Sequence, residues 1–174
     1  MKTLILGGVR SGKSRLAERL AAGSGLPVTY VATATAGDAE MAARIAAHRA
    51  QRSIDCTVVE APIALADTLL RHAREDACLL VDCLTLWLTN LLMQDDATVL
   101  ERERAALVAV IDQLPGQLLL VGNETGMGIV PLGELSRRYC DLAGTLHQTL
   151  AARCERVLLT VAGLPLALKG APVT

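Results

Sequence analysis

Aromatic side chains are almost absent from this chain of 174 residues: together they make up 2%, and Phe does not occur. Hydrophobic residues nevertheless account for 52% of the sequence. The core must therefore be built mainly from Leu, Val, Ile and Ala, which suits a parallel sheet covered by helices. The length suits one domain with a sizeable core, so we expect a single domain over residues 1–174.

Two further absences narrow the class of protein. No apolar run approaches the roughly 20 residues that a membrane-spanning helix requires. Neither sign of charge is in excess, because 17 Lys and Arg oppose 18 Asp and Glu, so no global field favours nucleic acid or an anionic membrane. Residues 1–3 lead directly into an apolar strand, without the long apolar stretch of a secretory signal. We therefore expect a cytoplasmic protein that binds neither nucleic acid nor a membrane.

The five cysteines are scattered and show no C-x-x-C spacing. This pattern favours free, mostly buried thiols over zinc ligands or disulfides.

The motif that organises the chain occupies residues 7–14 and fits G-x-x-x-x-G-K-[ST], the phosphate-binding loop of nucleoside-triphosphate enzymes. An apolar run over 3–6 precedes it, and helix formers over 14–21 follow it, so the strand–loop–helix context is correct. Backbone N–H groups would point at phosphate oxygens, Lys13 would reach the β- and γ-phosphates, and the Ser14 hydroxyl would coordinate Mg²⁺. The motif residues are Gly7, Gly8, Val9, Arg10, Ser11, Gly12, Lys13 and Ser14.

A second element of the same site is predicted at Asp82. Four apolar residues over 78–81 end in this acid, which is typical of the strand whose carboxylate holds Mg²⁺ beside a phosphate loop, directly or through water. On the following helix Trp87 is interpreted as core packing. The charged run 101–104 is interpreted as a solvated helix face.

Strand and helix patterns alternate along the whole chain. We therefore predict an α/β fold with a mainly parallel sheet flanked by helices, with ligands at the carboxyl ends of the strands. A loop over 123–131, polar and glycine-containing, has the character of an active-site loop. Strands are expected over 3–6, 28–33, 56–60, 78–82, 118–122 and 156–163, and helices over 14–21, 38–52, 62–72, 84–93, 97–114 and 132–152.

A histidine lies among arginines in the helix expected over 38–52. Arg44, His48 and Arg52 are spaced by four and would share one face, with Arg49 beside the histidine. Guanidinium groups suit phosphate oxygens, and nearby positive charge favours a neutral, nucleophilic imidazole. A neutral imidazole beside a triphosphate could attack phosphorus. The spacing alone, however, favours an exposed helix with incidental charges over this role.

Several motifs in order make the chain resemble the bifunctional adenosylcobinamide kinase/adenosylcobinamide-phosphate guanylyltransferase family of cobalamin biosynthesis. Together they extend over nearly the whole chain, and they are far more specific than the phosphate loop alone. The matching segments are GGVRSGKSRLAE (7–18), YVATA (30–34), DAEMAARIAAHRAQR (38–52), TVVE (57–60), VDCLTLWLTNLL (81–92) and NETGMGIVP (123–131).

The resemblance implies a P-loop enzyme, usually a homotrimer, that phosphorylates adenosylcobinamide with a nucleoside triphosphate. It then takes GMP from GTP onto a histidine and passes it to the new phosphate. By motif, His48 is the guanylylated nucleophile, which reverses the preference stated above, and GTP, ATP and Mg²⁺ are the expected ligands. The nucleotide-binding residues implied are residues 7–14, Ala32, Thr33, Ala34, Arg49, Ala50, Gln51, Arg52, Glu60 and Asp82.

The chain departs from the family pattern at Ser53, Cys56 and His147, where the family commonly has Pro, Trp and Asn. The first two departures leave open how the guanine is held. Two other functions stay open beside the bifunctional enzyme: another P-loop small-molecule kinase or hydrolase without a covalent intermediate, and a nucleotide-binding switch without turnover.

Overall fold

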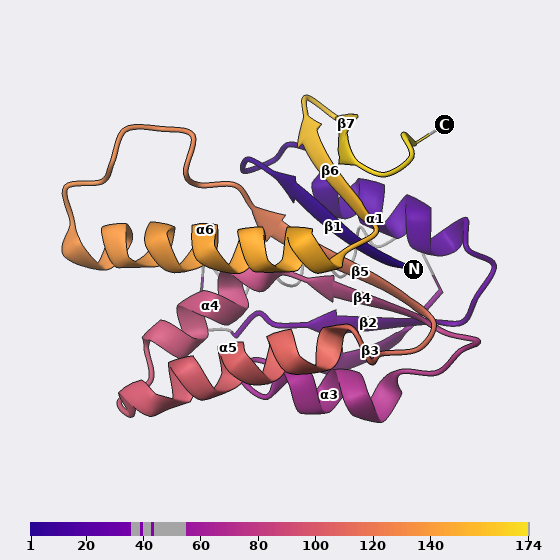
Figure 1. Cartoon of the computed structure of the whole chain (residues 1–174), viewed down its shortest axis with the longest axis horizontal. Helices are drawn as coiled ribbons and strands as arrows, with labels where there is room; N and C mark the ends of the chain where they lie inside the picture. Colours follow the sequence, from indigo (N-terminus) through magenta and orange to yellow (C-terminus); the bar gives the residue numbers. More distant parts are fainter. Residues whose placement is uncertain (36–38, 40–42, 44–54, 174) are drawn as a thin grey trace.

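A computed structural model describes residues 1–35, 39, 43 and 55–173 (Figure 1). The described strands form one seven-stranded sheet in the order β3-β2-β4-β5-β1-β6-β7. All neighbouring strands pair in parallel except β6 and β7, which are antiparallel. Their bounds are β1 Lys2–Gly7, β2 Val28–Ala32, β3 Thr57–Glu60, β4 Cys78–Asp82, β5 Gln117–Asn123, β6 Arg156–Val161 and β7 Leu164–Lys169.

The described helices cover both faces of this sheet (Figure 1). Helix α1 packs on one face and the other four pack on the opposite face, so the predicted three-layer α/β arrangement is confirmed. Successive side chains of a strand point to opposite faces of the sheet. In β1, Leu4 and Leu6 therefore belong to the core on one face and Ile5 to the core on the other. The bounds are α1 Lys13–Ala22, α3 Leu65–His72, α4 Leu84–Leu92, α5 Ala97–Ile111 and α6 Glu134–Arg153.

The core is aliphatic, as the composition predicted. Trp87 is fully buried on α4, and its indole N–H donates to the Ile63 carbonyl at 2.7 Å, so its interpretation as a core residue is confirmed. The five cysteines are free thiols, of which Cys78, Cys83 and Cys154 are buried. In the part of the chain that the structure describes, no helix is both long and apolar enough to cross a bilayer.

One strand was missed in the sequence. The strand expected over 156–163 ends at Val161, and a two-residue turn at Ala162 and Gly163 leads into β7. Both turn residues have positive φ, 51° and 82°, which is the backbone of the tight hairpin that matches strand twist. In β7 the leucines are exposed and Pro165 and Ala167 are half-buried, so its sequence lacks the apolar–polar alternation by which half-buried strands are recognised.

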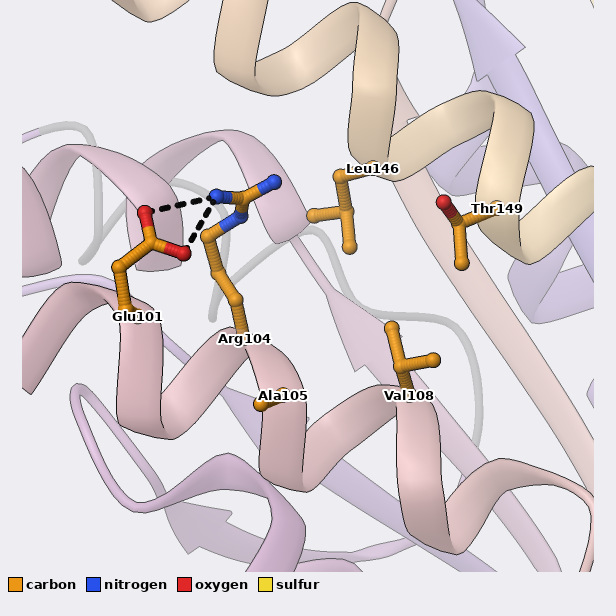
Figure 2. A pocket seen from close by; sticks show the side chains of 6 residues that line it. All are labelled: Glu101, Arg104, Ala105, Val108, Leu146 and Thr149. Carbon is orange, nitrogen blue, oxygen red and sulfur yellow. Dashed lines mark hydrogen bonds and ion pairs between the residues drawn. The ribbon is translucent and has the colours of Figure 1, made fainter.

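The interpretation of residues 101–104 as a solvated face is wrong for half of the run. Glu101 is exposed, but the Arg104 side chain is only 16% exposed and lies in the seam between α5 and α6, near Leu146 and Thr149 (Figure 2). Its Nη1 donates to Glu101 at 3.0 Å. Helical spacing explains the difference, because residue 104 lies one turn from the buried Leu100.

Candidate nucleotide site

The phosphate loop joins the end of β1 to the start of α1, as its motif predicted. Arg10 and Gly12 have positive φ, 56° and 95°, so the loop curls back on itself before the helix begins at Lys13. Among the residues that the structure describes, no side chain caps the start of α1. The first N–H groups of a helix have no partner within the helix, so this end offers donors and a favourable dipole to an anion.

Two glycines of the loop are required by close contacts. A Cβ on Gly7 would lie 2.5 Å from the Ser11 Oγ and 2.6 Å from the Thr160 carbonyl oxygen. A Cβ on Gly12 would lie 3.1 Å from the Gly163 Cα, and the Gly163 N–H donates to the Ser11 carbonyl at 2.8 Å. The hairpin turn between β6 and β7 therefore packs directly against the loop and holds its shape.

Lys13 extends over this loop. Its side chain is buried, and its Nζ donates to the Gly8 carbonyl at 3.0 Å. Burial lowers the pKa of Lys13 below its ordinary value, and the negative charge of Asp82 opposes that shift. The structure thus brings together two of the predicted site residues from different strands, one cationic and one acidic.

Asp82 ends β4, at the same edge of the sheet. The Tyr30 hydroxyl donates to its Oδ2 at 3.0 Å, which orients the carboxylate from β2. Ser14 is half-buried in the first turn of α1. A hydroxyl and a carboxylate are hard oxygen donors that suit Mg²⁺, which usually takes one or two protein ligands together with phosphate oxygens. Among the described residues, no three or more His, Cys, Asp or Glu side chains form a cluster that could hold a metal ion, and Mg²⁺ binding by Ser14 and Asp82 stays a prediction.

Thr33 joins the ends of β2 and β4. It is fully buried; its hydroxyl donates to the Cys83 carbonyl at 2.7 Å and accepts from the Cys83 N–H at 2.9 Å. Asn90 donates to the Thr33 carbonyl at 2.8 Å. The Thr33 side chain therefore supports the strand ends next to Asp82, and its predicted contact with nucleotide stays a prediction.

The remaining predicted residues divide into two groups. Glu60, Ala32 and Asp82 lie in register at the ends of three adjacent strands, with Glu60 exposed and Ala32 half-buried; Ala34 follows, also half-buried. The second group lies outside the described residues, so these assignments stay predictions: His48, Arg49, Ala50, Gln51 and Arg52.

Comparison with known proteins identifies the family of this chain. Residues 3–168 match the model of the family described as cobinamide kinase/cobinamide phosphate guanyltransferase. The chain belongs to this family of enzymes. The bifunctional adenosylcobalamin biosynthesis protein CobP of Pseudomonas aeruginosa is 64% identical over 99% of this chain and 100% of that protein. The corresponding protein CobU of Salmonella typhimurium is 38% identical over 97% of this chain and 100% of its own length.

Among solved structures, a protein of Pyrococcus horikoshii OT3 aligns with a TM-score of 0.53 at 10% identity. The alignment covers 97% of this chain and 86% of that one. At this identity the likeness concerns the fold alone.

Two further residues lie next to the phosphate loop; one of them, Glu124, belongs to the 123–131 loop that was expected to have the character of an active-site loop. The Glu124 N–H donates to the Gly7 carbonyl at 3.0 Å, so this acid lies beside the phosphate loop. Its Oε2 lies 3.9 Å from Nδ1 of His147, which is buried on α6. Burial lowers the pKa of His147, and the charge of Glu124 opposes the shift. Glu124 directly follows the buried strand β5, the position that marked the 123–131 loop in the sequence.

Two buried threonines, Thr33 and Thr160, provide a matched test of whether the Thr33 hydroxyl stabilises the strand ends beside Asp82. Thr33→Val removes a hydroxyl that makes two hydrogen bonds and leaves the Cys83 backbone unpaired, so it should lower the free energy of unfolding by about 1–3 kcal/mol. Thr160 is equally buried, but its hydroxyl has no hydrogen-bond partner among the described residues. Thr160→Val should therefore be neutral or stabilising. Urea unfolding without nucleotide measures both, and equal losses would contradict the assigned role of Thr33.

Proposed function

We propose that the protein phosphorylates adenosylcobinamide and then transfers GMP from GTP to the phosphate, giving adenosyl-GDP-cobinamide and pyrophosphate in cobalamin biosynthesis. The observation that carries the proposal is the phosphate loop with Lys13 near Asp82, in a chain that matches the family over residues 3–168. The proposal includes ATP or GTP as phosphate donor, Mg²⁺ as cofactor and a cytoplasmic homotrimer as the working form.

In the kinase step, a hydroxyl oxygen of the substrate attacks the γ-phosphorus. The bond to the bridging oxygen breaks, and a nucleoside diphosphate leaves. Lys13 and the N–H groups at the start of α1 stabilise the negative charge on the transferring group and on the leaving oxygen. Mg²⁺, held by Ser14 and Asp82, would neutralise further phosphate charge.

In the guanylyltransferase step, a ring nitrogen of His48 attacks the α-phosphorus of GTP and pyrophosphate leaves. A phosphate oxygen of the phosphorylated substrate then attacks the same phosphorus, the P–N bond breaks, and His48 is regenerated. This assignment is supported by the family motif around His48 and by the arginines spaced along it. Arg49 and Arg52 would balance the phosphate charge.

The two steps share the phosphate cradle, so one substitution should impair both. Lys13→Met removes a cation that faces the phosphates and should lower both activities by at least about 100-fold. The matched control is Lys169→Met. Lys169 donates to the carbonyls of Ala151 and Ala152, and it pairs with the start of β6, away from the strand ends that carry the phosphate loop. Steady-state assays of each reaction measure the effect, and a Lys13→Met enzyme with either activity intact would contradict the shared cradle.

The covalent step can be tested with GTP that carries a label on its α-phosphate. After incubation with Mg²⁺ and denaturation, the protein should retain acid-labile, base-stable label, and His48→Ala should abolish it. His72, at the end of α3, is the matched control, and its substitution should preserve the label. Label retained in His48→Ala would mean that another residue is the nucleophile. Kinase activity without any label would favour a P-loop small-molecule kinase.

A further inference from the structure

A pocket of about 360 Å³ lies between α4, the start of α6 and the loop that joins β5 to α6. None of the residues that line it is charged, and most of its surface is apolar. Tyr139 contributes its ring, and burial raises the pKa of its hydroxyl to about 12, so this group stays neutral. The principal lining residues are Thr89, Leu92, Met93, Pro131, Leu135 and Tyr139.

The pocket is connected to the phosphate loop through the end of β5. Thr125 lines the pocket, and the residue before it, Glu124, donates its N–H to Gly7 at the start of the loop. The Asn123 N–H donates to the Thr85 hydroxyl at 2.7 Å, which fastens the end of β5 to the first turn of α4. The pocket therefore lies beside the phosphate loop, at the sheet edge where ligands of α/β proteins bind.

The loop next to the pocket carries large apolar side chains in contact with solvent. Ile129 and Leu132 are each 98% exposed, and Met127 and Val130 are also largely exposed. Figure 1 shows this loop, in orange, extending from the end of β5 beyond the sheet. Contiguous exposed apolar groups of this kind mark surfaces that bind a ligand or partner.

We propose that this pocket and the adjoining loop bind the corrinoid acceptor. The inference rests on the proposed function, which requires a bulky acceptor to present a hydroxyl to the γ-phosphate. A corrinoid combines a broad, methyl-bearing ring with uncharged amides, and uncharged, mainly apolar walls with a few hydroxyl groups are complementary to it. The volume of the pocket lies within the range of small-molecule sites.

The charge of the pocket wall also disfavours the nucleotide as its occupant. A triphosphate is held by cationic side chains together with backbone N–H groups, and the wall offers no cation beside the start of α6. The cradle for phosphates lies on the other side of Glu124, at residues 7–14. One edge of the ring in the pocket would leave its hydroxyl-bearing arm free to extend past Thr125 toward that cradle.

Two variants test the pocket, and each changes one side chain that lines it. Ser136→Trp places an indole in the pocket, and Leu135→Ser removes apolar contact area; both positions are exposed on α6, so neither change disturbs the core. Equilibrium dialysis with adenosylcobinamide, without nucleotide, should show a dissociation constant raised about 10-fold or more. The KM for adenosylcobinamide in the kinase reaction should rise in parallel, while labelling by GTP stays unchanged.

Leu70→Ser is the matched control, because Leu70 on α3 is 52% exposed and Leu135 is 54% exposed. It should leave adenosylcobinamide binding unchanged. Wild-type affinity in both pocket variants would overturn the assignment of the site and leave the proposed function intact. A loss of binding that accompanies dissociation of the protein, measured by light scattering, would identify the pocket as a contact between copies of this chain and overturn the inference. Absence of adenosylcobinamide binding by the wild-type protein would overturn the proposed function, and the site with it.

Discussion

The parallel pairing of β1 with β5 and β6 is the constraint on which the site depends. It places Gly7 beside Asn123 on one side and Thr160 on the other, so the phosphate loop begins between two strand ends. The turn that follows β6 then closes over the loop through the hydrogen bond from Gly163 to Ser11. The cradle is therefore shaped by chain segments from both ends of the sequence, and donors held in this way need little reorganisation during reaction.

The strand order gives this cradle its electrostatic partner. β5 separates β1 from β4, yet the carboxylate at the end of β4 still acts on the Lys13 ammonium. Burial alone would favour loss of the lysine proton, and the acid opposes that effect. Tyr30 and Thr33, both on the β2 side, keep this strand end in place. Hydrogen bonds from the β2 side thus hold the strand end whose carboxylate, on Asp82, acts on the charge of Lys13.

Short sequence patterns predicted those features that depend only on residues close together in the chain. The phosphate loop, the apolar strand that ends in Asp82 and the buried Trp87 each follow from a short run of residues. Strand β7 did not, although its partner β6 is adjacent in sequence, because its leucines are exposed. The partial burial of Arg104 depends on α6, which is distant in sequence. The loop that contains Glu124 was recognised from its place after a buried strand, but its contact with the phosphate loop depends on the pairing of β5 with β1.

The arrangement also explains how one cradle could serve displacements at two phosphorus atoms. The chain leaves β2 at Ala32, at the ligand-binding edge, and the segment that contains His48 connects this strand to β3. The apolar pocket lies on the β5 side of the phosphate loop. In-line attack requires each nucleophile to lie opposite its own leaving oxygen, and a phosphate loop that holds the triphosphate can serve both proposed displacements.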